Sequence, residues 1–303
     1  MNRWRIYERE RFPLVAHAPL VAAFSASAVC YSTLVRGSRA APSLAALLVA
    51  FLTSLIFFLQ LRIADEFKDL EDDARYRPYR PVPRGLVSLR ELAWVGVAGA
   101  VVQLVLALTL QPSNAWLLLG AWLYLALMTR EFFAAVWLKR HAVVYMTSHM
   151  VILPLVDLYA TACDWGIAGA GRLPAGLFWF LVVSYLNGIV VEIGRKTRAP
   201  VDEETGVETY SALWGTRRAA AVWMGAVFVT AAAAWRAAWQ IGTARPMLVL
   251  LTVLLVACGI ASTRVVRSDA PGSGKAIEVM SGAWTVFMYL GLGAAPLAFA
   301  AWR

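Results

Sequence analysis

The feature that most constrains this chain is a succession of nine long runs of apolar residues. A helix that crosses the hydrocarbon core of a bilayer needs about 20 predominantly apolar residues, so nine such helices would use roughly 180 residues. That total agrees with the 60% hydrophobic content of the 303-residue chain. The sequence therefore predicts an all-α integral membrane protein and excludes a soluble enzyme, a disordered chain and a single-pass receptor. The runs cover residues 14–35, 43–64, 92–110, 115–137, 143–163, 174–193, 219–241, 246–262 and 277–301.

The positions of the basic residues predict how the chain crosses the membrane. Lys and Arg are enriched in the cytoplasmic connections of multi-pass proteins. With a cytoplasmic N-terminus, 22 of the 28 Lys and Arg residues fall in cytoplasmic segments. We therefore attribute the net charge of +9 to membrane topology and expect the lipid bilayer, with no nucleic acid, as the partner of this surface. A bacterial-type inner membrane is the expected location.

Two of the predicted cytoplasmic connections, residues 62–91 and 192–218, are longer and carry more charge of both signs than the others. Each follows the second helix of a four-helix set. We therefore expect a single transmembrane domain, residues 1–303, with two weakly similar halves at about 14–163 and 174–301 and a ninth helix added to the repeat. The functional residues are expected in these two acidic loops.

Aspartates in the first loop recur with a helical period. Asp65, Asp69 and Asp73 are four residues apart, and Asp72 adjoins the last of them. If the helix continues through them, successive carboxylates stack on one face about 6 Å apart along its axis. Like charges repel at that spacing, and a helix C-terminus also disfavours anions, so a cation is expected there. Oxygen ligands at a membrane surface suit Mg²⁺, which keeps several waters and is completed by substrate phosphates.

A solvated loop is the alternative interpretation of the same residues. In that case nearby cations would neutralise the acids as surface ion pairs, each of which contributes little. The candidates are Arg62, Lys68, Arg75 and Arg77.

The second loop repeats this combination of acids and bases. Glu192 ends an apolar run, and Asp202 and Glu203 follow ten residues later. These acids are further candidate metal ligands, because a Mg²⁺-bound diphosphate needs oxygen ligands beside fixed cations. The alternative is again a mixed-charge loop. The cations that would bind the phosphate oxygens are Arg195, Lys196 and Arg198.

The first loop resembles a known sequence motif. The segment DEFKDLEDD, residues 65–73, followed by YRPYRPVPRG, resembles the first aspartate-rich motif of the UbiA superfamily of intramembrane prenyltransferases. That motif reads Asn-x-x-x-Asp-x-x-x-Asp with Arg-Pro and Gly downstream. Asp69 and Asp73 match the two family aspartates, and Arg80 with Pro81 matches the downstream element. Asp65 replaces the usual Asn and adds a negative charge.

The second loop and a basic pair extend the resemblance. The segment GVETYSALWG, residues 206–215, resembles the end of the family's second motif and places Asp202 on one of its metal-binding acids. The family commonly has a second Asp a short helical distance upstream, whereas here the nearest upstream acid is Glu192. Lys139 and Arg140 resemble the family's Lys-Arg pair for diphosphate.

The resemblance implies a ring of helices around a central apolar cavity that opens toward the membrane, with an isoprenyl diphosphate and two or more Mg²⁺ ions at its cytoplasmic end. The catalytic acids would be Asp65, Asp69, Asp73, Glu192 and Asp202, and Asp72 and Glu203 would complete the metal ligands. Arg80, Lys139 and Arg140 would join the second-loop cations in binding diphosphate.

The chemistry these residues support is ionisation of an allylic C–O bond. Mg²⁺ and basic side chains stabilise the departing diphosphate, while an apolar cavity shields the carbocation from water. Aromatic faces can stabilise that cation, although buried aromatic residues also serve packing alone. Asn187 could contact the substrate or bond a neighbouring helix. The candidate pocket residues are Phe58, Tyr145, Tyr185 and Asn187.

Three functions remain open from the sequence. An aromatic or lipid acceptor could capture the cation, which would make the chain a prenyltransferase. The substrate's own double bonds could capture it instead, which would make the chain a membrane terpene cyclase. A secondary transporter is the third alternative, but it predicts ionisable groups near the midplane rather than acidic clusters at helix ends. The sequence assigns no role to five other ionisable residues in or near the apolar runs, Arg130, Glu131, His149, Asp157 and Glu278.

Overall fold

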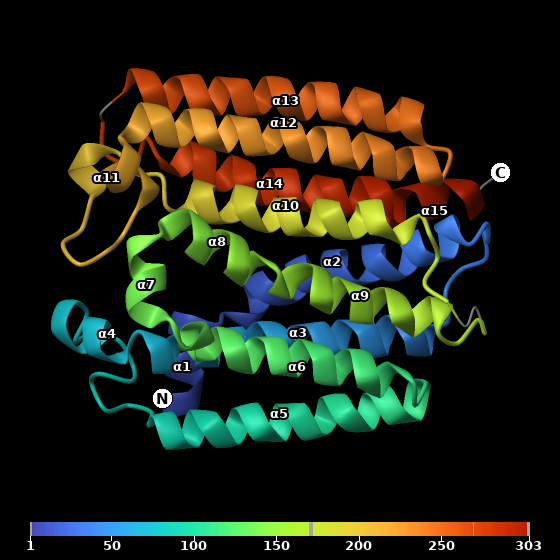
Figure 1. Cartoon of the computed structure of the whole chain (residues 1–303), viewed down its shortest axis with the longest axis horizontal. Coiled ribbons are helices and arrows are strands. Elements are labelled where there is room, and N and C mark those ends of the chain that lie inside the picture. The colour runs from blue at the N-terminus through green and yellow to red at the C-terminus, as the bar shows by residue number, and fades with distance from the viewer. Residues whose placement is uncertain (1, 170–171, 269, 302–303) are drawn as a thin grey trace. The chain divides into compact units, whose positions relative to one another are not determined.

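In the computed structural model, which describes residues 2–169, 172–268 and 270–301, the regular structure of the described chain is helical (Figure 1). The helices are α1 (Arg3–Arg11), α2 (Leu14–Val35), α3 (Leu44–Lys68), α4 (Leu70–Tyr76), α5 (Leu89–Leu110), α6 (Asn114–Thr129), η1 (Glu131–Phe133), α7 (Ala135–Arg140), α8 (Ala142–Met150), α9 (Ile152–Trp165), α10 (Leu177–Arg195), η2 (Pro200–Asp202), α11 (Tyr210–Trp214), α12 (Thr216–Gln240), α13 (Ala244–Arg267), α14 (Lys275–Leu292) and α15 (Ala294–Ala301).

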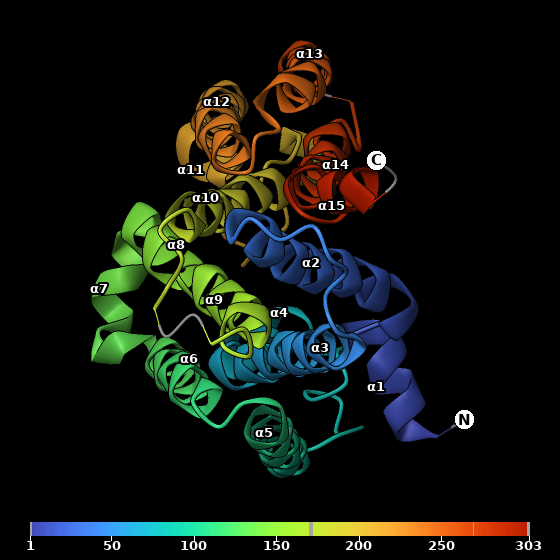
Figure 2. The ribbon, with the colours of Figure 1, turned by 90° about the vertical axis from the view of Figure 1, so that its right-hand side faces the viewer.

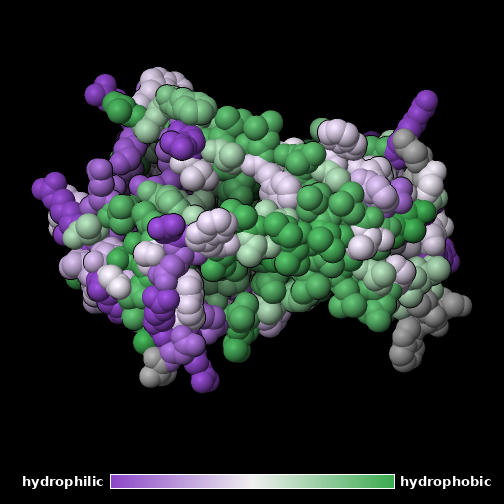
Figure 3. All heavy atoms as spheres, turned by 90° about the horizontal axis from the view of Figure 1, so that it is seen from below, coloured by the Kyte–Doolittle hydropathy of each residue, from purple (hydrophilic) through white to green (hydrophobic). Residues whose placement is uncertain are grey.

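The helices match the predicted apolar runs closely. Eight segments of the described chain are long and apolar enough to cross a membrane, and α6 is a shorter apolar helix at the position of the remaining run. The prediction of about nine helices is confirmed, and the chain is an integral multi-pass membrane protein. In Figure 3, hydrophobic residues cover the middle of the face in view and hydrophilic residues gather at its left end. The central cavity and the repeated halves stay predictions.

Two of the membrane segments are broken near a proline. The segment Ala142–Trp165 consists of α8 and α9, which are separated at Val151, and the segment Lys275–Ala300 consists of α14 and α15, which are separated at Gly293. In each case a proline, Pro154 or Pro296, lies three residues after the break. Proline has no N–H to donate to the carbonyl four residues earlier, so the helical ladder is interrupted there.

One predicted run, 115–137, is not a single helix, and the prediction was wrong for residues 130–137. Helix α6 ends at Thr129, and Glu131, Phe132 and Phe133 all have positive φ, at 49°, 50° and 59°. A right-handed helix needs negative φ, so three such residues stop it. The chain then turns into the short helix α7. Glu131 therefore lies in a turn rather than within a membrane helix.

The chain forms two compact units, each built from more than one stretch of sequence. The first comprises Met1–Val29, Pro42–Tyr145 and Leu155–Gly171. In it, α3, α5 and α6 pack on one another. Buried Gln103 joins them, because its Nε2 donates to the Thr53 carbonyl at 3.0 Å and its Oε1 accepts from Trp122 Nε1 at 3.0 Å. The loop before α5 ends in a capping box between Ser88 and Glu91, which fixes the start of that helix.

The second unit comprises Cys30–Ala41, Met146–Pro154 and Arg172–Arg303. Its four long helices α10, α12, α13 and α14 lie side by side, as Figure 2 shows nearly end-on. Trp223 Nε1 of α12 donates to Ser281 Oγ of α14 at 2.8 Å. A Cβ on Gly194 of α10 would collide with the Ser281 side chain, so glycine permits the close approach of these helices. Tyr31 is fully buried and stacks on Phe180.

Candidate active site

The predicted aspartate series lies where α3 passes into α4. Asp69 separates the two helices with φ −94° and ψ 7°. The backbone ladder nevertheless continues, because Asp69 N–H donates to the Asp65 carbonyl at 2.9 Å and Asp73 N–H donates to the Asp69 carbonyl at 2.7 Å. The three aspartates therefore follow one another at helical spacing across a slight bend.

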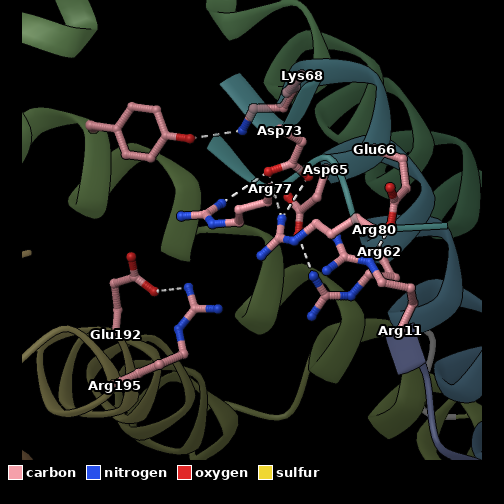
Figure 4. Close-up of polar contacts among 11 residues, drawn as sticks. Arg11, Arg62, Asp65, Glu66, Lys68, Asp73, Arg77, Arg80, Glu192 and Arg195 are labelled. Atoms are coloured by element: carbon pink, nitrogen blue, oxygen red, sulfur yellow. Dashed lines mark hydrogen bonds and ion pairs between the residues drawn. The ribbon is translucent and has the colours of Figure 1, made fainter. Parts of the chain in front are cut away.

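Asp73 is the buried member of this series and is bound by two arginines (Figure 4). Arg80 Nη1 lies 2.7 Å from Asp73 Oδ1 and 2.6 Å from Oδ2, and Arg77 Nη1 lies 2.9 Å from Oδ1. Hydrogen bonds between ionised groups are stronger than neutral ones. The arginine of the Arg-Pro element is thus held against the aspartate of the same motif, seven residues earlier in the chain.

Asp65 and Asp72 make weaker pairs than Asp73, whereas Glu66 is buried and pairs with Arg11 at 2.5 Å. Arg62 lies 3.4 Å from Asp65, and Lys139 Nζ lies 3.5 Å from Asp72 with both side chains more than half exposed. Exposed pairs of this kind contribute about 0–1 kcal/mol. The pair with Lys139 is informative for another reason, since it brings one predicted diphosphate residue beside the first motif. Arg140 is exposed and forms no ion pair with a described residue.

Asp69 differs from its neighbours. It is partly buried, and no hydrogen bond or ion pair joins its carboxylate to another described residue. Burial raises the pKa of Asp69 above its ordinary value, and the charges of Asp65 and Asp73 raise it further, against the opposing effect of Lys68 and Arg80. Burial and the neighbouring carboxylates therefore favour binding of a cation at Asp69, and no described residue supplies one as an ion-pair partner.

A buried network next to Asp69 was not predicted as a unit. Lys68 Nζ donates to the Tyr145 hydroxyl at 2.8 Å and lies 3.0 Å from Glu131 Oε1. The Lys68 and Glu131 side chains are only 7% and 15% exposed. The positive φ at Glu131 brings this carboxylate to Lys68, and sequence periodicity carries no signal for such a turn. The sequence singles out each member separately, Lys68 as a cation of the first loop, Tyr145 as a pocket candidate and Glu131 as an ionisable residue without a role.

In the second unit, Glu192 is buried and pairs with two cations one turn further along the chain, Arg195 at the end of α10 and Lys196 directly after it. Lys196 Nζ lies 2.9 Å from Glu192 Oε1, and Arg195 Nη2 lies 2.5 Å from Oε2. Two predicted diphosphate residues are thus brought to one predicted metal ligand, as Figure 4 shows for Arg195.

The acids that follow Glu192 form contacts within their own loop and to the loop before α14. Asp202 Oδ2 accepts from the Gly272 N–H at 2.7 Å, which joins the second motif to the loop before α14. Glu203 accepts from the Thr209 and Ser211 hydroxyls, each at 2.6 Å. Arg198 pairs with Glu204 at 3.0 Å. In this arrangement Glu203 stabilises the loop, and its predicted role as a metal ligand stays a prediction.

The candidate pocket residues have different surroundings, and Tyr145 belongs to the network with Lys68. Tyr185 donates to the Thr147 carbonyl at 3.2 Å, and Phe58 packs edge-on against Phe24 at 5.5 Å between ring centroids. Asn187 is 1% exposed, and neither its Nδ2 nor its Oδ1 has a hydrogen-bond partner among the described residues. A buried amide without hydrogen-bond partners lowers the stability of the folded protein. Of the pocket candidates, Asn187 is therefore the one that a hydrogen bond from a polar ligand would stabilise most.

The donor chemistry of the first loop fits Mg²⁺. Among the described residues no three acidic, histidine or cysteine side chains form a ready-made group for a metal ion. Mg²⁺ does not need one, because it is usually held by one or two carboxylates, with waters and substrate phosphates as the other ligands. Asp69 offers a carboxylate that pairs with no described residue, and Asp65 lies 3.4 Å from its cation, Arg62. Both are oxygen donors at a helix end that disfavours anions.

Known structures decide the fold. No protein-family model and no curated protein matches the sequence. The chain is similar to the apo structure of a UbiA homologue from Aeropyrum pernix K1, with a TM-score of 0.66 and 15% identity over 89% of this chain and 96% of that one. The chain has the UbiA fold.

Two further structures support this assignment. A digeranylgeranylglyceryl phosphate synthase matches with a TM-score of 0.63 and 14% identity over 98% of this chain and 100% of that one. A UbiA homologue from Archaeoglobus fulgidus bound to DMAPP and Mg²⁺ matches with a TM-score of 0.57 and 14% identity over 94% and 98% of the two chains. The fold implied by the two sequence motifs is confirmed.

Proposed function

We propose that this chain is an intramembrane prenyltransferase that uses Mg²⁺ to ionise an isoprenyl diphosphate and transfers the prenyl group to an aromatic or lipid acceptor. The observation that carries the proposal is the aspartate series Asp65–Asp69–Asp73 with Arg77, Arg80 and Lys139 beside it, at a helix end of a UbiA fold. Solved neighbours with that fold are bound to DMAPP or GPP together with Mg²⁺.

The aspartates would hold the metal ions. Asp69 and Asp65 are the first ligands in this proposal. Asp69 forms no ion pair with a described residue, and Asp65 lies 3.4 Å from Arg62. Asp73 and Asp72 would follow, and Glu192 and Asp202 are the candidates in the second unit. Mg²⁺ held by these carboxylates would supply positive charge that stabilises the diphosphate as a leaving group.

The cations beside the acids would bind the diphosphate itself. Arg77 and Arg80 are already oriented by Asp73, and a guanidinium can bind phosphate oxygens in a bidentate manner. Lys139 and Arg140 are exposed and can reach a charged ligand at the membrane surface. Arg195 and Lys196 have the same role beside Glu192 in this proposal. Keeping these cations on carboxylates before the substrate binds reduces their reorganisation during the reaction.

The test is turnover of a labelled substrate by the purified protein. Wild-type protein with Mg²⁺, geranylgeranyl diphosphate and a panel of aromatic and lipid alcohol acceptors should release diphosphate and form a prenylated product. Asp69→Asn should lose this activity. Glu71→Gln, which removes an exposed charge two residues away, is the matched control and should keep it. Full activity of a folded Asp69→Asn protein would refute the assignment of Asp69.

Terpene cyclisation is the second candidate function. Asp65 in place of the family's Asn and the altered second motif both depart from the transferase pattern. Incubation with farnesyl or geranylgeranyl diphosphate and Mg²⁺ in the absence of acceptor distinguishes the two. Cyclic hydrocarbon or terpene alcohol in a hexane extract would establish a cyclase, whereas intact substrate would favour transfer.

A further inference from the structure

Two adjoining hollows lie on α13 and α14 in the second unit, and none of the predicted site residues lines either of them. The first is a trough of about 430 Å³ between the helices. Small residues form its floor, at Ala257, Ala261 and Ala276, and the larger Ile260 and Val279 stand beside them half exposed or more. Since both helices belong to membrane-spanning segments, an apolar trough at this level favours contact with a hydrocarbon chain.

The second hollow continues the first toward the end of α13. It measures about 470 Å³ and is lined by Arg264, Arg267 and Ser273. Arg264 and Ala276 line both hollows, so the apolar trough leads directly into a basic one. Ser273 Oγ is shielded from solvent and has no hydrogen-bond partner among the described residues. A hydroxyl donor in that position suits an anionic oxygen.

The charge around the second hollow is mainly positive. Arg264 and Arg267 line it, and Lys275 lines the adjoining end of the trough. All three are exposed, and none forms an ion pair with a described acid. Two described acids lie close in the chain or the loop. Glu278 is exposed one turn after Lys275, and Asp202 is engaged with the Gly272 N–H. Asp269 lies outside the described residues.

We propose that these hollows bind one anionic phospholipid. Its phosphate would lie against Arg264 and Arg267 with the Ser273 hydroxyl as a donor, and one acyl chain would lie in the trough over Ala261 and Ala276. Basic pockets between transmembrane helices at the cytoplasmic surface suit anionic headgroups, and this end of α13 is the predicted cytoplasmic end. The apolar trough distinguishes a phospholipid from a free phosphate ion, which would use only the basic hollow.

Lipid affinity of the purified protein tests the proposal. Native mass spectrometry and thermal unfolding would compare phosphatidylglycerol with phosphatidylcholine added to detergent-solubilised protein. We expect preferential binding of phosphatidylglycerol and a rise in Tm with it. Each arginine near a membrane surface contributes about fivefold to binding of an anionic lipid, so Arg264→Gln with Arg267→Gln should weaken that binding about 25-fold.

The matched control is Arg245→Gln, which removes an exposed arginine from the opposite end of the same helix. It should leave the preference unchanged. A second variant, Ala257→Phe, fills the trough at a residue that does not line the basic hollow. It should weaken binding of phosphatidylglycerol while leaving a Tm shift from inorganic phosphate unaltered.

Three results would overturn the proposal. They are equal binding of the two lipids by the wild-type protein, an unchanged preference in the double arginine variant, and an equal response to inorganic phosphate alone. None of these readouts depends on prenyl transfer, so they test lipid binding independently of the proposed function.

Discussion

At the scale of single residues, the site is defined by which acids have a cation and which do not. Asp73 and Glu192 are buried and firmly paired, and Asp65 and Asp72 are weakly paired. Asp69 has no ion-pair partner in the part of the chain that the structure describes. A buried carboxylate without a partner destabilises the folded protein unless it becomes protonated or binds a cation. This difference singles out Asp69 for the first substitution.

We predict that Asp69→Asn stabilises the metal-free protein at neutral pH. The pKa of Asp69 is raised above 3.8 in the folded state, so its ionisation costs stability. That cost is fully present above the raised pKa and disappears as the pH falls toward 3.8. Thermal unfolding of both proteins in EDTA at several pH values should therefore show a higher Tm for the variant at pH 7.5 and convergence in acid. A lower Tm for the variant at pH 7.5 would contradict the prediction.

The network of Lys68, Glu131 and Tyr145 gives a second prediction. Breaking a buried ion pair by removing one partner costs about 3–5 kcal/mol, whereas removing both costs less than the sum. Glu131→Gln should lower the free energy of unfolding by about 3 kcal/mol. Lys68→Met combined with Glu131→Gln should show a favourable coupling of at least about 1 kcal/mol in a double-mutant cycle. Additive effects would show that the pair does not act as a unit.

At the scale of elements, glycine and proline decide where helices approach and where they break. The breaks before Pro154 and Pro296 follow from a missing N–H, and the contact between α10 and α14 follows from a missing Cβ at Gly194. Both effects are properties of the backbone. They can be tested by substitutions that restore the N–H missing in proline or the Cβ missing in glycine.

We predict that Gly194→Ala destabilises the second unit. The new Cβ would collide with the Ser281 side chain, which itself bonds to Trp223, and overpacking of this kind costs about 1–3 kcal/mol. Gly225→Ala on α12 is the control, because a Cβ there meets no atom within 4 Å. Unfolding in a graded denaturant should separate the two variants. Equal stability of both would mean that the helices can move apart at no cost.

At the scale of the whole molecule, the predicted topology places the N-terminus and both acidic loops on one side of the membrane. The bias of Lys and Arg toward those segments carries this expectation. The three native cysteines, Cys30, Cys163 and Cys258, are buried, so the wild-type chain should react little with a thiol reagent that does not cross membranes.

Single cysteines can therefore report the side on which a loop lies. A maleimide that does not cross membranes should label Glu71→Cys and Glu208→Cys in inverted vesicles from the native membrane. It should label Ser113→Cys and Arg39→Cys only in right-side-out vesicles. All four positions are exposed. Labelling of Glu71→Cys and Glu208→Cys from opposite sides would contradict the proposed topology.

The sequence by itself determined the membrane class, the approximate helices and the two acidic loops, because hydrophobic length and charge bias act locally along the chain. Helical periodicity also placed Asp65, Asp69 and Asp73 in series. Only the tertiary structure decided which cations those acids meet. The contacts of Lys68 with Glu131 and of Asp202 with Gly272 join residues far apart in the chain. They depend on a turn with positive φ and on loop packing, which apolar periodicity does not encode.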